Sequence, residues 1–354
     1  MQKIFIFFIL SISLFFNSCS TDVDINADWK DVTIVYSILN LNDTIQYVKI
    51  NKAFLGSANA YDMAKNSDSL FYKSINKVSL QQGRTNSNGD WEGYGQEIIL
   101  QKTTDIPKDS GIFANDRNDI FYTTEKLQKN DTYNEYRLVI DVPNKDLITA
   151  TTKVFDNLTV KEPTTWGSRK VNFASSVPYT VKWNSTKDAR LYEVTVRYWY
   201  YEIIGTDTTL KHLDWAQPRM VSTKLEQEVE MTLDIDGPGF FKYVQSQLKP
   251  LASGKRLSRR KKAIDFIFLI GGDDLNTYIQ VSSPSNTIVQ EKPSYTNING
   301  ENNLGIFSCK FDETIPEQEI DQRMIDSLAL GIYTKNLNFL SYNQAINFYS
   351  NTDE

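Results

Sequence analysis

The chain has 354 residues, a net charge of −6, 12% aromatic residues, two cysteines and a single histidine. Its acidic balance argues against a nucleic-acid partner, which needs a concentrated basic face. One histidine excludes a metal site with two or more histidine ligands and leaves oxygen-ligand ions such as Ca²⁺. We therefore expect no nucleic acid, no cofactor and no metal.

The first predicted element is a signal peptide over residues 1–18. After Lys3, residues 4–16 read "IFIFFILSISLFF". As a helix this run would span roughly 20 Å, short of the ~30 Å apolar core of a bilayer. A short apolar core that ends at Ser18 and Cys19 resembles the lipobox of bacterial lipoproteins. The resemblance implies cleavage before Cys19 and acyl chains on that residue, which hold a protein on a membrane.

A short tether follows over residues 19–30. It carries Asp22, Asp24 and Asp28 in the stretch "STDVDINAD". In some Gram-negative lineages an acidic stretch after the lipidated cysteine directs export, and this segment is similar to such a signal. The resemblance implies an outer-membrane location, with the cell surface favoured over the periplasmic face.

Residues 31–155 have the pattern of an immunoglobulin-like β-sandwich, with short β-branched and aromatic runs separated by turn residues. The run 132–142 alternates well, with Tyr136, Leu138 and Ile140 on one face. A short helix is expected in a crossing loop at 58–66. The expected strands are 32–39, 44–53, 78–82, 97–103, 132–142 and 147–154.

Residues 156–315 resemble a fibronectin type III module with a helical insertion. In such modules a strand tryptophan packs on an inward residue of the next strand, which here would pair Trp183 with Tyr192 or Val194. The insertion is a helix at 237–248 because its apolar residues recur at helical spacing between Gly-Pro-Gly and Pro250. Strands are expected at 178–183, 189–204, 225–235, 264–270 and 276–281, the last two joined by "GGDD".

The tail, residues 316–354, is expected to be helical and to dock on the second domain. Its residues Ile320, Met324, Ile325 and Leu328 follow a helical period, and Gly331 gives a stop. The whole chain is thus predicted to be all-β, with two tandem β-sandwiches and a few short helices.

Three stretches together resemble a group of uncharacterised Bacteroidota outer-membrane lipoproteins. They are "DVTIVYSILNLNDTIQYVKINKAFLG" at 31–56, "SSPSNTIVQEKPSYTNINGENNLGIFSC" at 282–309 and "IDSLALGIYTKNLNF" at 325–339. The resemblance implies two β-sandwich modules and a place in the envelope. It implies no activity, so no catalytic residue is carried over.

Two groups of aromatic residues are candidate contacts for a partner or a glycan. Trp91 and Tyr94 are expected at the tip of a glycine-rich loop, and Trp199 and Tyr201 on the outward face of a long strand. The alternative is that the helix or the other domain covers this outward face.

A basic cluster, Arg259, Arg260, Lys261 and Lys262, is the candidate for contact with an anionic partner such as lipid head groups. The alternative is a solvated loop.

Three further features have structural interpretations that we prefer to a site. "GGDDLN" at 271–276 offers oxygen ligands for Ca²⁺ but lacks the spacing of an EF-hand, and a plain turn is preferred. His212 is interpreted as a solvated loop or strand-end residue, and Cys309 as a buried structural thiol.

Three functions stay open at this point. The favoured one is a non-catalytic, lipid-anchored outer-membrane protein that binds a partner, as an accessory of an envelope complex such as an outer-membrane barrel. The second is a surface glycan-binding or adhesive module. The third is a hydrolase that acts through two carboxylates, which the 44 acidic residues allow.

Overall fold

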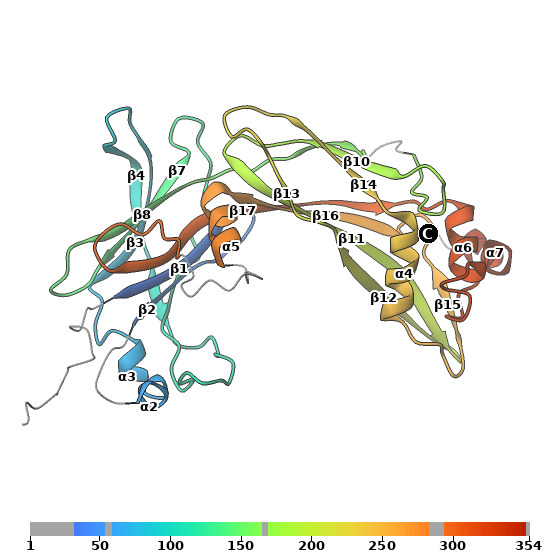
Figure 1. The fold of residues 1–354 in the computed structure, drawn as a ribbon, viewed down its shortest axis with the longest axis horizontal. Helices are drawn as coiled ribbons and strands as arrows, with labels where there is room; N and C mark the ends of the chain where they lie inside the picture. The colour runs from blue at the N-terminus through green and yellow to red at the C-terminus, as the bar shows by residue number, and fades with distance from the viewer. Residues whose placement is uncertain (1–31, 54–58, 165–168, 283–293, 352–354) are drawn as a thin grey trace, which may run out of the picture.

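The computed structural model describes residues 32–53, 59–164, 169–282 and 294–351. They form two β-sandwiches joined end to end in an arch (Figure 1). The predicted all-β architecture with two sandwiches and a few short helices is therefore confirmed. The expected signal peptide and tether, residues 1–30, lie outside the described residues, as do residues 283–293 of the second stretch used for the resemblance.

The first sandwich packs a four-stranded sheet on one half of a ten-stranded sheet, hereafter the long sheet. The four-stranded sheet has the order β4-β3-β7-β8, with bounds β3 (Lys77–Thr85), β4 (Trp91–Ile99), β7 (Glu135–Asp141) and β8 (Ile148–Lys153). The long sheet contributes β1 (Thr33–Asn40), β2 (Gln46–Lys52), β5 (Gln101–Thr103) and β6 (Ile120–Thr123). Inward residues such as Val35, Leu39 and Leu138 are fully buried between them.

The second sandwich packs a three-stranded sheet on the other half of the long sheet. The smaller sheet has the order β14-β10-β9, with bounds β9 (Thr159–Glu162), β10 (Tyr179–Asn184) and β14 (Glu230–Ile235). The long sheet contributes β11 (Ala189–Ile204), β12 (Asp207–Ala216), β13 (Met220–Val221), β15 (Lys255–Ser258) and β16 (Ile264–Gly272). Trp183 is fully buried with its ring 6.0 Å from that of Tyr192, which confirms the expected pair.

A single sixteen-residue strand, β17 (Asn303–Gln318), belongs to both sandwiches. Its first half, through Lys310, runs parallel to β1, and its second half runs antiparallel to β16. The sequence boundary placed 156–315 in the second domain, but residues 303–310 complete the first one. The expected boundary does not separate the two sandwiches, because β17 is one continuous strand whose partner changes from β1 to β16 partway along it.

Helices close the ends of the arch. Helices α2 (Ala60–Ala64) and α3 (Ser67–Leu70) lie at the end of the first sandwich. Helix α4 (Gly237–Gln247), which matches the expected helix, places Phe240 and Val244 in the second core. In the tail, α6 (Gln322–Leu330) buries Met324, Ile325 and Leu328, and α7 (Tyr342–Asn351) follows it. The tail packs on the second sandwich, where the Tyr349 hydroxyl donates to the Ser258 carbonyl at 2.8 Å.

Helix α5 (Asp273–Ser282) replaces the strand expected at 276–281. Two features explain why this segment forms a helix and not a strand. Asp273 and Asp274 occupy its first turn, where the helix dipole favours negative charge. Leu275, Tyr278 and Ile279 are three and four residues apart, so they share one helix face, and that face packs on the long sheet.

Candidate binding surface

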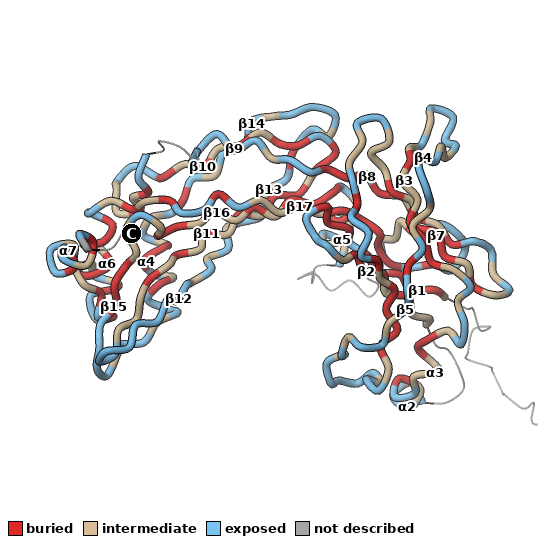
Figure 2. Tube along the Cα trace, turned by 180° about the vertical axis from the view of Figure 1, so that it is seen from behind, coloured by how far each residue is buried: buried red, intermediate tan, exposed pale blue. Residues whose placement is uncertain are grey.

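One face of the long sheet covers the two cores, and the other lines the concave side of the arch (Figure 1, Figure 2). On the concave side of the first sandwich, four large apolar residues stay exposed on three adjacent strands. We call them the aromatic face: Tyr36 (43% exposed), Ile38 (39%), Tyr47 (44%) and Leu304 (39%).

The aromatic face follows from the pleat of β1 and its neighbours. Successive side chains of a strand point to opposite faces, so Tyr36 and Ile38 point outward while Val35 and Leu39 point into the core. Tyr36 pairs with Ile306 of β17, and Ser37 donates to the Tyr47 carbonyl of β2 at 2.8 Å. The exposed residues thus lie side by side across β17, β1 and β2.

Helix α5 borders the aromatic face. The ring of Tyr278 meets that of Tyr36 edge-on, with centroids 6.4 Å apart. Burial, and then the hydrogen bond with Tyr278, raise the pKa of Tyr36 to about 12. The phenol therefore stays neutral at physiological pH and offers a partner an apolar ring with a polar tip.

Trp199 lies on the same side of the long sheet, in the second sandwich, and is held in place from three directions. Its indole N–H donates to Asp265 at 2.7 Å, its ring is 4.8 Å from that of His212, and the Arg197 guanidinium is 5.7 Å from the ring. Arg197 is fixed in turn by two hydrogen bonds to Asp214, at 2.7 and 2.8 Å. His212 is thus a mid-strand residue of β12, and its expected loop or strand-end position is wrong.

Tyr201 and Trp199 are both half-buried, and a helix of the tail contacts Tyr201. The ring of Tyr201 packs on Phe348 of α7, with centroids 5.8 Å apart. For this residue the alternative holds: a helix of the tail covers the outward face of β11.

Trp91 and Tyr94 belong to β4 and not to a loop tip, which corrects that expectation. The turn is confined to residues 86–90, where Asn86 donates to the Asp90 carbonyl at 2.9 Å, and Trp91 already pairs with Thr85. The Trp91 indole lies over Gly83, because a Cβ at that glycine would be 2.6 Å from Trp91 Cζ2. These residues stand on the four-stranded sheet, so the structure does not bring them together with Trp199.

Tyr94 is about half exposed, and one face of its ring is covered by another aromatic ring. It stacks on Tyr133, with centroids 4.7 Å apart and the planes 12° apart. Of the four aromatic candidates, Tyr94 is exposed, and the other three are half-buried.

The basic cluster is less available than its sequence indicates. Arg260 pairs with Glu319 at 3.1 Å and Lys262 with Glu317 at 3.0 Å. Arg259 is half-buried and Lys261 is exposed. Carboxylates of β17 and of the segment after it therefore offset part of the charge that an anionic partner would meet.

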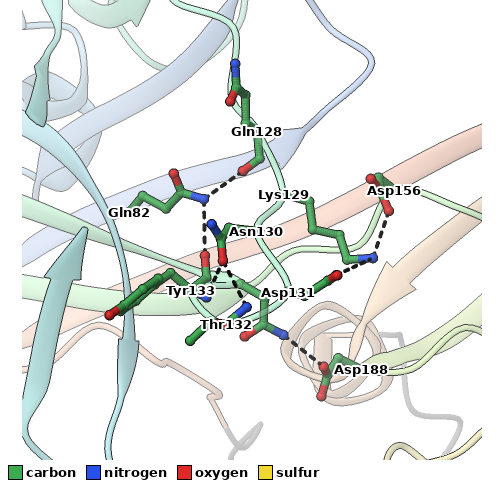
Figure 3. Close-up of polar contacts among 10 residues, drawn as sticks. Gln82, Gln128, Lys129, Asn130, Asp131, Thr132, Tyr133, Asp156 and Asp188 are labelled. Carbon is green, nitrogen blue, oxygen red and sulfur yellow. Dashed lines mark hydrogen bonds and ion pairs between the residues drawn. The ribbon is translucent and has the colours of Figure 1, made fainter. Parts of the chain in front are cut away.

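A cleft of about 310 Å³ lies where the two sandwiches meet, and it is the place that best fits the carboxylate alternative. Five acidic side chains line it: Glu135, Asp188, Glu226, Asp273 and Asp274. Asp188 links the two sandwiches, whereas Asp273 pairs within the second one. Asp188 binds Lys153 at 2.8 Å and Asn134 at 3.2 Å, and Arg190 binds Asp273 at 2.8 Å. Figure 3 shows Asp188 next to residues 129–133, which precede β7.

Asp274 is the acid of this cleft that lies beside Tyr295. It is half-buried and accepts a hydrogen bond from the Tyr295 hydroxyl. Burial raises the pKa of Asp274, against the opposite effect of Tyr295. The segment "GGDDLN" contains the last two residues of β16 and the first turn of α5, so the expectation of a plain turn is wrong. No group of three or more His, Cys, Asp or Glu side chains is placed to hold a metal in the part of the chain that the structure describes.

Cys309 is buried on β17, and burial raises the pKa of its thiol to about 12. The predicted structural thiol is confirmed.

Among the described residues, no helix is long and apolar enough to cross a membrane.

Comparison with known proteins adds little to this geometry. No family model and no curated protein matches the chain. A solved structure, CBD12 from CALX1.2, is similar over 78% of this chain and 98% of its own, with 10% identity and a TM-score of 0.17. At that score the likeness carries no argument about function.

The aromatic face is the feature that sequence reasoning missed, although a signal exists. In "VTIVYSIL" the outward positions are as large and apolar as the inward ones, whereas a strand with one solvated face normally alternates with polar residues. A run of this kind also fits a strand that is buried on both faces, so its exposure could not be read without the neighbouring strands.

Proposed function

We propose that this chain is a lipid-anchored outer-membrane protein that binds a protein partner and catalyses no reaction. The single observation that carries the binding role is the aromatic face. Contiguous exposed apolar side chains on a soluble surface are typical of interaction sites, and Tyr is enriched at their energetic centres. The lipobox at Cys19 and the resemblance to envelope lipoproteins support the location.

The shape of the arch favours a convex partner. The aromatic face lies inside the curve, and the concave side opens toward the end of the molecule that carries α2 and α3 (Figure 1). A partner that protrudes from the same membrane, such as the rim of an outer-membrane barrel, fits this arrangement. The role is then that of an accessory subunit of an envelope complex.

The test compares two variants of the lipidated protein after cross-linking on intact cells and affinity capture. Ile38→Lys combined with Tyr47→Lys places two charges on the aromatic face. Loss of about 2 kcal/mol at such a centre lowers affinity roughly 30-fold, so capture of a stoichiometric envelope protein should disappear. The matched control, Tyr94→Lys, changes an equally exposed tyrosine on the other sheet and should leave capture unchanged. Equal capture by both variants would contradict the proposal.

Glycan binding is a second candidate, and Trp199 is the observation that favours it. Its rigid, partly exposed indole is suited to stacking on a sugar ring. Under this candidate, Trp199→Ala should abolish retention on surface polysaccharide, while the double lysine variant should retain it.

A further inference from the structure

A second group of exposed apolar side chains lies at the free end of the first sandwich. Tyr61 of α2 is 65% exposed, and Ile112 and Phe113 of the loop before β6 are 57% and 51% exposed. The two segments are joined by a hydrogen bond from the Ala114 N–H to the Ala64 carbonyl, at 2.8 Å. We call Tyr61, Ile112 and Phe113 the apolar tip.

Side-chain contacts connect the segment that follows Phe113 to the start of β1. Arg117, four residues after Phe113, donates to the Tyr72 carbonyl at 3.3 Å, and its guanidinium is 5.3 Å from the ring of Phe71. The Tyr72 hydroxyl is in turn 2.8 Å from Thr33 Oγ1. The tip and the residue where the described chain begins therefore lie at the same end of the molecule.

The length of chain ahead of β1 limits how far this end stands from the membrane. Cys19 and Val32 are 13 residues apart (32 − 19). A fully extended segment of that length reaches at most about 45 Å, and a flexible one has an average span of roughly 20 Å. A protein held through Cys19 therefore keeps the start of β1 within about 45 Å of the bilayer.

We propose that the apolar tip inserts into the interface of the bilayer that holds the acyl chains of Cys19. This inference rests on the proposed lipid anchor and adds an orientation to it. The side chains are suited to such an interface, because Phe113 and Ile112 are apolar and Tyr61 combines an apolar ring with a hydroxyl that stays at the level of the head groups. Two contacts hold a protein on a membrane more firmly than acyl chains alone.

The consequence is a fixed orientation of the arch. With α2 and α3 against the bilayer, the concave side and its aromatic face look toward the membrane surface (Figure 1). A partner would then be met close to the lipid and not far above it.

The experiment places an environment-sensitive bimane label in the lipidated full chain, bound to phosphatidylethanolamine and phosphatidylglycerol vesicles. Single variants Phe113→Cys and Tyr61→Cys are labelled at the tip, and Tyr94→Cys is the matched control on the far sheet. Labelling is specific because Cys309 is buried and Cys19 is acylated. Lipids brominated near the head group should quench both tip labels at least twofold and leave the control label unchanged.

Two results overturn the inference, and they are distinguishable. In the first result, intact mass shows that the vesicle-bound protein carries acyl chains, and the tip labels are quenched no more than the control label. The tip then does not contact lipid, although the protein is lipid-anchored. If the mass shows no acylation at Cys19, the proposed anchor fails and the tip fails with it. A further variant, Ile112→Asp, should remove most of the quenching at the Phe113→Cys label, whereas Leu210→Asp on the exposed hairpin of β12 should not.

Discussion

Gly305 is the residue at which the pairing of β1 and β17 is most sensitive to a single methyl group. It sits in β17 opposite Val35 of β1, with φ at +118°. A Cβ at this position would lie 1.8 Å from the Val35 carbonyl oxygen, whereas side-chain carbons do not approach closer than 3.0 Å. Gly305→Ala therefore forces the two strands apart by at least 1.2 Å (3.0 − 1.8).

The size of the effect follows from that displacement. A ladder hydrogen bond of about 2.9 Å that lengthens by this amount is lost, at about 0.5–1.5 kcal/mol for each of two bonds. The unfavourable φ adds about 1–3 kcal/mol. We expect Gly305→Ala to lower the free energy of unfolding by about 4 kcal/mol, a large part of the 5–15 kcal/mol typical of a folded protein.

The assay is urea unfolding followed by tryptophan fluorescence, with Gly111→Ala as the matched control. A Cβ at Gly111 meets nothing within 4 Å, so the control should change the free energy of unfolding by less than about 0.5 kcal/mol. Hydrogen exchange should show faster exchange in both β1 and the first half of β17. A loss below about 1 kcal/mol for Gly305→Ala would refute the tight parallel pairing of these strands.

The remaining predictions concern buried and paired charges. Arg256 is 3% exposed and pairs with Glu202 at 3.0 Å. Arg256→Ala should therefore lower the free energy of unfolding in urea by about 3–5 kcal/mol. A loss below about 1 kcal/mol would contradict a buried ion pair. Burial raises the pKa of Asp274, so its charged form is disfavoured in the folded state and stability is lost as pH rises through the carboxyl range. The stability of Asp274→Asn relative to wild type should therefore increase from pH 3.5 to pH 7, and an equal difference at both values would contradict this. Arg260→Ala with Lys262→Ala should change binding to anionic vesicles less than about twofold, because carboxylates already pair with both side chains; a tenfold loss would restore the basic cluster as a site.

Strand patterns were the most predictable part of the fold, because alternation of inward and outward residues depends only on local chain geometry. Tyr192, Val194 and Val196 of β11 are buried as their spacing predicts, and Trp183 meets Tyr192 across the second core. Helix α4 was equally clear, since Gly237 and Pro238 mark its start and Pro250 follows its end. These elements carry their own boundaries in the sequence.

Features that depend on distant partners were not predictable. The sharing of β17 between two cores depends on pairing with β1, more than 260 residues away. The short run of α5 fits a strand or a helix until its face toward Leu191 and Ile306 is known. Trp91 and Tyr94 follow turn residues, and only the pairing with β3 shows that they belong to a strand.

The candidate surface has one part that the sequence could predict and one part that it could not. Trp199 could be placed on the outward side of its strand by counting, but its fixation by Asp265 and His212 comes from two other strands. The aromatic face needed β17, β1 and β2 to be adjacent, which sequence patterns do not state.

Binding of a partner inside the arch is tested most directly by site-specific photo-cross-linking on intact cells. A benzophenone side chain is placed at Tyr47, on the aromatic face, and separately at Tyr94, on the far sheet, with both positions about half exposed. We predict one discrete cross-linked envelope protein from position 47 and none from position 94. Cross-links from position 94 alone, or from neither position in cells that contain the lipidated protein, would contradict partner binding at the aromatic face.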